Sequence, residues 1–201
     1  MTAVVRMTVL HMRTVAPYRT QGLLVFGLLM VILGRTPDHV VPALAMLLAP
    51  LIAVHPFVVA DKTDLRMLYA VLPVRRRTVL LGHYAWALAS YLATVVAGTV
   101  LSVLLARAEG VPFGGRDLTT MVTLSWGLFC LNIAIQFPLL IRFGYARISV
   151  LGTTMPLALV MLAVYRLHLT ITSIQPWLPL FWAAGAAAMA ISAAVAARKE
   201  S

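Results

Sequence analysis

Few polar side chains interrupt the long apolar runs of this sequence, and three of them could carry chemistry within a bundle of helices. Asn132 and Gln136 are four residues apart and therefore share one face of a helix. They could line a polar path, or they could bridge two helices by hydrogen bonds, which is the commoner role of such residues in membranes. His55 could relay a proton, or it could pack between helices. All three residues are thus predicted to serve the passage of a substrate or a proton, or the packing of helices, and none is predicted to catalyse a reaction.

No set of residues typical of catalysis is found in the sequence. It contains no Gly-x-Ser-x-Gly and no His-Glu-x-x-His motif, and its two glutamates, Glu109 and Glu200, lie outside the apolar runs. No carboxylate lies deep within an apolar run, which argues against a carrier driven by protons or sodium ions. The chain is therefore predicted not to be an enzyme and to bind no metal or cofactor of its own.

The densest group of charges lies in residues 61–84, between two long apolar runs, and includes five of the sixteen Lys and Arg residues. Four apolar side chains within it recur at i, i+3, i+4 and i+7, which predicts one apolar stripe on a short helix. These residues are Leu65, Leu68, Tyr69 and Leu72. Pro73 must end this helix, and a second helix is expected to start near residues 74–77 and to continue through Tyr84. A helix too short to span a membrane either lies on lipid or inserts into a groove of another protein.

The composition of the chain indicates an integral membrane protein. It is 62% hydrophobic and 11% charged, with a mean hydropathy of +0.95, whereas soluble domains are roughly 45–50% apolar and about 25% charged. Its apolar runs are continuous, as in membrane helices, and do not alternate as barrel strands do. We therefore predict one all-α, polytopic transmembrane domain over residues 1–201, with a basic lead in residues 1–19 and the charged segment 61–84 between spans two and three. The six predicted spans cover about residues 20–34, 40–60, 85–106, 118–141, 148–165 and 174–197.

The distribution of basic residues predicts the orientation of the spans. If both termini lie on one side, that side carries twelve Lys and Arg residues and the other side carries four. Because cytoplasmic segments of membrane proteins are enriched in Lys and Arg, both termini, residues 61–84 and the turn at residues 142–147 are predicted to be cytoplasmic. Orientation and anionic membrane lipids also account for the net charge of +10, without a nucleic acid partner.

The two internal cytoplasmic segments carry recognisable motifs. The first contains Ala60-Asp61-Lys62, then Leu72-Pro73-Val74-Arg75-Arg76-Arg77-Thr78-Val79, then Gly82-His83-Tyr84. The second is Ile135-Gln136-Phe137-Pro138-Leu139-Leu140-Ile141-Arg142-Phe143-Gly144-Tyr145-Ala146-Arg147. The first resembles the acidic start, Leu-Pro-Val-Ser-Arg and Gly-Arg-Tyr elements of small type-2 ATP-binding-cassette (ABC) exporter permeases. The second is similar to the Pro-Leu and Phe-Gly turn of the same family, and both have the family's order, spacing and sidedness.

The resemblance implies a six-helix permease that is half of a homodimer or heterodimer and docks on a separate ATPase subunit. It also implies that the segment between spans two and three is the coupling helix, whose apolar stripe contacts the ATPase. The further docking residues implied are Pro73, Arg75, Arg76 and Arg77, with the arginines facing acidic groups or lipid phosphates. The candidate site residues in the second cytoplasmic turn are Arg142, Phe143, Gly144 and Arg147. Arg75 replaces a Ser that could cap a helix, and Lys62 replaces an acid, so this segment is more basic than is usual in the family.

We therefore expect a permease of the bacterial plasma membrane that couples ATP hydrolysis to export of a peptide, a lipid-like molecule or a hydrophobic drug. The sequence contains no Gly-x-x-x-x-Gly-Lys-Ser/Thr loop, so ATP and Mg²⁺ are expected on the partner subunit. The alternative is a membrane scaffold or sensor that recruits a soluble partner through residues 61–84 without moving a substrate. A partner that carries the phosphate-binding loop favours the exporter.

Overall fold

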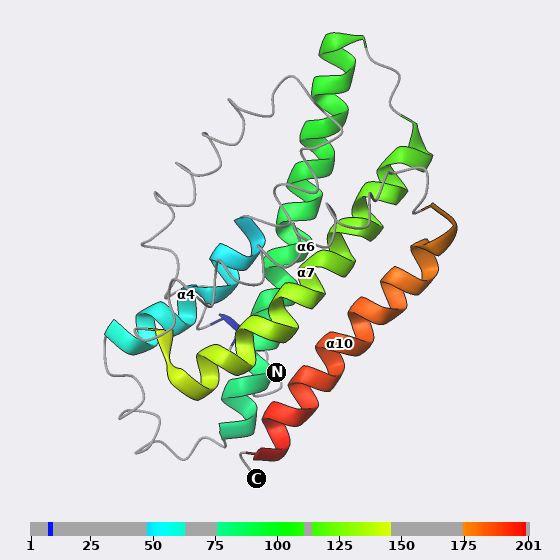
Figure 1. Ribbon diagram of the computed structural model, residues 1–201. Helices are drawn as coiled ribbons and strands as arrows, with labels where there is room; N and C mark the ends of the chain where they lie inside the picture. The colour runs from blue at the N-terminus through cyan, green and yellow to red at the C-terminus, as the bar shows by residue number, and fades with distance from the viewer. Residues whose placement is uncertain (1–7, 10–47, 63–75, 111–113, 146–174, 200–201) are drawn as a thin grey trace.

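The computed structural model describes residues 8–9, 48–62, 76–110, 114–145 and 175–199, and helices account for nearly all of them. In Figure 1, three long helices (α6, α7 and α10) run side by side, and the shorter α4 lies against the lower half of α6. α6 runs in the opposite direction to the other three. Their bounds are α4 Ala49–Lys62, α6 Arg76–Glu109, α7 Gly115–Phe143 and α10 Leu178–Lys199, with the 3-10 turn η3 Gln175–Trp177 leading into α10. The described part of the chain is therefore all-α, as the sequence predicts.

Three of the described helices are long and apolar enough to cross a membrane: Arg77–Glu109, Gly115–Phe143 and Leu178–Arg198. They overlap the third, fourth and sixth predicted spans, and α4 overlaps the latter part of the second. The first and fifth predicted spans lie outside the described residues, and so does the predicted short helix at residues 65–72. A multi-helix membrane domain is therefore established, whereas the six-span count and the coupling helix stay predictions.

α6 is longer than the hydrocarbon core of a membrane. Its 34 residues correspond to about 50 Å, against a core of about 30 Å. The helix begins at Arg76, within the range in which the sequence predicts a second helix after Pro73. It continues without a break to Glu109, where Gly110 adopts φ +66° and ends it. One uninterrupted helix thus connects the charged segment to the opposite side of the bundle.

The hydrophobic core of the described residues lies between α4, α6, α7 and α10. Fully buried α7 side chains recur at helical spacing along one face, and they are Phe129, Ile133, Phe137 and Leu140. Rings from the two neighbouring helices pack on them: Phe57 and Tyr84 lie 5.1 Å and 5.0 Å from Phe137, and Tyr91 lies 4.7 Å from Phe129. Aromatic side chains therefore join α4 and α6 to α7.

α7 and α10 pack at the distance that two glycines allow. A Cβ atom on Gly185 would lie 3.1 Å from Cα of Gly127 and 3.3 Å from Cβ of Cys130. Small residues at such crossings are typical of membrane bundles, because close backbone approach increases van der Waals contact. One turn further along α10, the sulfur of Met189 lies 3.8 Å from the sulfur of Cys130 in the core. The α7–α10 contact thus depends on the absence of side chains at its centre.

We expect Gly185→Val to force α10 away from α7 and to lower the free energy of unfolding by roughly 1–3 kcal/mol. Ala184→Val is the matched control, because Ala184 is exposed on the same helix, and its effect should stay within about 0.5 kcal/mol. Unfolding in mixed micelles measures both changes. Equal stability of the two variants would contradict the close crossing.

Candidate functional site

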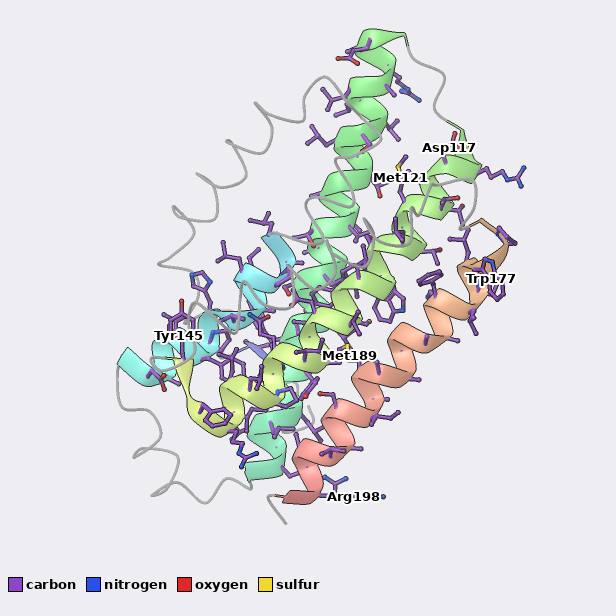
Figure 2. All side chains as sticks on the ribbon, viewed as in Figure 1. Asp117, Met121, Tyr145, Trp177, Met189 and Arg198 are labelled. Carbon is purple, nitrogen blue, oxygen red and sulfur yellow. The ribbon has the colours of Figure 1, made fainter. Side chains whose placement is uncertain are left out.

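Basic helix ends lie together at one end of the bundle. Figure 1 shows the ends of α4, α7 and α10 at the same end as the start of α6. Figure 2 labels Tyr145 and Arg198 at this end, and Asp117 and Trp177 at the opposite end. Among the described residues, the charged ones at the first end are Asp61, Lys62, Arg76, Arg77, Arg142, Arg198 and Lys199, whereas Arg107, Glu109, Arg116 and Asp117 balance one another at the second. The described helix ends that are predicted to share one side of the membrane therefore lie together, and the identity of that side stays a prediction.

The backbone conformation after α7 explains why this turn contains a glycine, Gly144. It adopts φ +80°, a conformation that other residues rarely adopt, and its N–H donates to the Leu140 carbonyl at 2.9 Å to close the helix. Arg142 lies over the ring of Phe143 at 5.3 Å, and both side chains are exposed, Phe143 by 44%. An exposed ring paired with a cation suits contact with lipid headgroups or with a partner protein. Arg147, also predicted for this turn, lies outside the described residues.

Pro56 creates the first unusual polar contact of the bundle. Because proline has no N–H, the carbonyl of Ile52, four residues earlier in α4, loses its donor within the helix. The indole Nε1–H of Trp86 on α6 donates to this carbonyl at 3.1 Å. Ser90, one turn further along α6, donates from its Oγ to the carbonyl of Ala87 in its own helix at 2.8 Å, and the same Oγ lies 3.4 Å from the carbonyl of Ala49. The Trp86 side chain of α6 thus satisfies a backbone group of α4.

Pro138 creates a second contact of the same kind in α7, where it removes the donor for the carbonyl of Ala134. Ser192 of α10 replaces that donor, because its Oγ donates to Ala134 at 3.1 Å. A serine hydroxyl has one proton, so the Tyr84 hydroxyl must donate in the 2.8 Å bond between Tyr84 and Ser192. Two hydrogen bonds thus run from Tyr84 of α6 through Ser192 of α10 to Ala134 of α7, and we call them the Ser192 chain.

The Ser192 chain joins the two sequence motifs that the resemblance singled out. Tyr84 ends the Gly82-His83-Tyr84 element, and Pro138 lies in the second segment. Phe137, the residue before Pro138, also packs against the Tyr84 ring at 5.0 Å. The sequence alone predicts no role for Ser192 or Trp86. A signal existed for Ser192, which is the one hydroxyl-bearing residue of α10, whereas nothing in the sequence pairs Trp86 with Ile52.

The two amides predicted for a polar path or a helix bridge are buried in α7. Asn132 and Gln136 expose 7% and 1% of their surfaces, and the side-chain oxygen of each has no hydrogen-bond partner among the described residues. A buried acceptor that stays unpaired costs roughly 1–3 kcal/mol. His55, also buried, donates from Nδ1 to the carbonyl of Leu51 at 2.9 Å in its own helix. The roles of these three residues in a path or a bridge stay predictions.

Most residues of the predicted docking element lie outside the described part of the chain. They are Leu65, Leu68, Tyr69, Leu72, Pro73 and Arg75. Arg76 begins α6, and Arg77 follows with an exposed side chain. Within the described ranges, no three His, Cys, Asp or Glu side chains gather as a metal site requires.

Comparison with protein families finds a match over most of the chain. The model of the family described as "ABC-2 family transporter protein" matches residues 18–199. The matched range includes α4, α6, α7 and α10 and both motif segments. No curated protein and no solved structure gives a significant match.

Trp86→Phe keeps an aromatic ring but removes the N–H that the Ile52 carbonyl accepts, and we expect it to lower the free energy of unfolding by roughly 1–3 kcal/mol. Pro56→Ala provides a backbone N–H for the same carbonyl, so the double variant should recover part of that loss. The single and double variants form a double-mutant cycle measured by unfolding. Strictly additive effects would show that Trp86 and Pro56 are not linked.

Gln136→Leu replaces the amide with an apolar side chain of similar size. Because the amide oxygen is unpaired among the described residues, we expect the free energy of unfolding to stay unchanged or to rise by up to about 2 kcal/mol. Ser125→Ala is the contrasting variant and should destabilise, because Ser125 Oγ donates to the Val122 carbonyl at 2.8 Å and contacts the Tyr91 hydroxyl at 3.1 Å. A clear loss of stability in Gln136→Leu would mean that the amide does have a partner.

Proposed function

The chain belongs to the ABC-2 family of transporter proteins, and from this membership we propose that it is the membrane-spanning permease subunit of an ATP-driven exporter. The family match is the observation that carries the proposal. The apolar described spans suit a peptide, a lipid-like molecule or a hydrophobic drug as the exported substrate. Within these spans, acidic residues occur only near helix ends, at Asp61, Glu109 and Asp117, which favours ATP over an ion gradient as the energy source.

The proposal requires a separate ATPase subunit. ATP and Mg²⁺ would bind there, because this chain has no phosphate-binding loop. Two permeases, identical or related, would assemble with two ATPase subunits in the plasma membrane of a bacterium. The ATPase would dock on residues 61–84 at the basic end of the bundle, which in this proposal faces the cytoplasm together with both termini. The clustering of basic helix ends supports this placement, because cytoplasmic segments are enriched in Lys and Arg and face the anionic lipids of the inner leaflet.

α4 and α6 are the helices through which docking would act on the membrane domain. α4 ends at Lys62 and α6 begins at Arg76, so the proposed docking segment lies between them in the chain. The two helices are joined by the Trp86–Ile52 hydrogen bond and by the packing of Phe57 on His83. A displacement of the docking segment would therefore move α4 and α6 as a pair, and α6 would transmit it across the membrane.

We expect Leu68→Asp to reduce copurification of the ATPase subunit by about tenfold or more, because it places a charge in an apolar interface. Membrane insertion should be unchanged. Met67→Asp is the matched control, since helical periodicity places Met67 opposite the stripe, and it should retain the ATPase.

Affinity purification from membranes, with immunoblotting for the ATPase, measures both variants. Normal ATPase binding by Leu68→Asp would show that the docking assignment is wrong. Recovery of a kinase or regulator with the unmodified chain, and of no ATPase, would instead support the scaffold alternative.

A further inference from the structure

We propose that the Ser192 chain makes α6 and α10 move as one unit together with the part of α7 around Pro138. Ser192 is then a positioning residue for coupling, because it connects the C-terminal helix to the helix that follows the docking segment. The role in coupling rests on the proposed function. The mechanical connection between the helices does not, and it can be tested without an ATPase.

The position of Tyr84 carries the first step of the argument. Tyr84 lies eight residues after the start of α6, or about 12 Å along the helix. Tyr91, whose hydroxyl contacts Ser125 of α7, lies seven residues further along. A displacement at the start of α6 therefore reaches the Tyr84–Ser192 contact before it reaches the Tyr91 contact.

Burial makes the Ser192 chain difficult to break. Tyr84 and Ser192 expose 4% and 8% of their surfaces. Because both side chains are buried in the protein, water has little access to replace a lost hydrogen bond, and the low local dielectric strengthens the bonds that remain. Separation of α6 from α10 would leave a buried hydroxyl unpaired, and separation of α10 from α7 would leave the Ala134 carbonyl unpaired. Both losses are avoided when the three helices move together.

Pro138 explains why α7 depends on a neighbour at this level. A proline inside a helix breaks one backbone hydrogen bond and allows the helix to bend there. Ser192 pairs with the freed carbonyl of Ala134 and thereby restrains the bend. The part of α7 beyond Pro138 leads to Gly144, in the second cytoplasmic turn. α10 is thus placed to hold that turn in register with the start of α6.

The mechanical connection is tested by pulsed electron resonance between spin labels on introduced cysteines at Ala89 of α6 and Ala194 of α10, both exposed positions. Cys130 is buried, and a sample without introduced cysteines measures its background labelling. With Ser192 present, we expect one narrow distance distribution for the purified chain in nanodiscs. Ser192→Ala, and independently Tyr84→Phe, should broaden or shift it. Tyr91→Phe is the matched control and should leave it unchanged. An unchanged distribution in both test variants would overturn the connection.

The coupling role is tested in the complex with the ATPase subunit. Ser192→Ala and Tyr84→Phe should retain the ATPase but reduce its activation by the permease at least about fivefold, which is typical of coupling between sites. Tyr91→Phe should keep that activation. Normal activation in both test variants would overturn the inference, whereas failure of the unmodified chain to bind any ATPase would overturn the proposed function instead.

A rescue variant separates coupling from simple stabilisation. Pro138→Ala supplies a backbone N–H for the Ala134 carbonyl, so the double variant Ser192→Ala with Pro138→Ala should regain thermal stability. It lacks the bond from Tyr84 to Ser192, so ATPase activation should stay low. Recovery of both stability and activation would show that Ser192 only satisfies the carbonyl, and the inference would be wrong.

Discussion

The requirement that backbone carbonyls be paired inside a membrane organises the described part of this protein. Pro56 in α4 and Pro138 in α7 each remove one helical donor, which leaves the carbonyls of Ile52 and Ala134 without an N–H in their own helices. Lipid offers no replacement. Each carbonyl instead receives a side-chain donor from another helix, Trp86 in the first case and Ser192 in the second. Prolines that weaken single helices thus specify how the helices pair.

These contacts give α6 a central place among the described helices. It meets α4 through Trp86, α7 through Tyr91 and α10 through Tyr84. The polar groups are positioned by apolar packing, since the Tyr84 ring lies on Phe137 while its hydroxyl reaches Ser192. The same side chains therefore serve both the hydrophobic core and the polar links.

Local features of this structure were predictable from the sequence, and contacts between helices were not. Continuous apolar runs predicted membrane helices, and Pro73 predicted a new helix start near Arg76, because both depend on neighbouring residues. The family resemblance was confirmed by the family match. The four-residue spacing of Asn132 and Gln136 predicts that they share one face of a helix, but whether their side-chain oxygens find partners depends on what surrounds α7. Trp86 and Ser192 find their acceptors on helices distant in sequence, and helical periodicity contains no information about those partners.

The length of α6 has a mechanical consequence. A helix of about 50 Å that turns about its middle is a lever with two arms of about 25 Å, and a tilt of about 10° moves each end by about 4 Å in opposite directions. A displacement of the basic start of α6 would therefore appear at Gly110, on the opposite face of the bundle, with the same size and the opposite direction. Transmission of this kind needs no change of secondary structure, only a fulcrum, and the aromatic contacts near the middle of α6 are placed where a fulcrum would be.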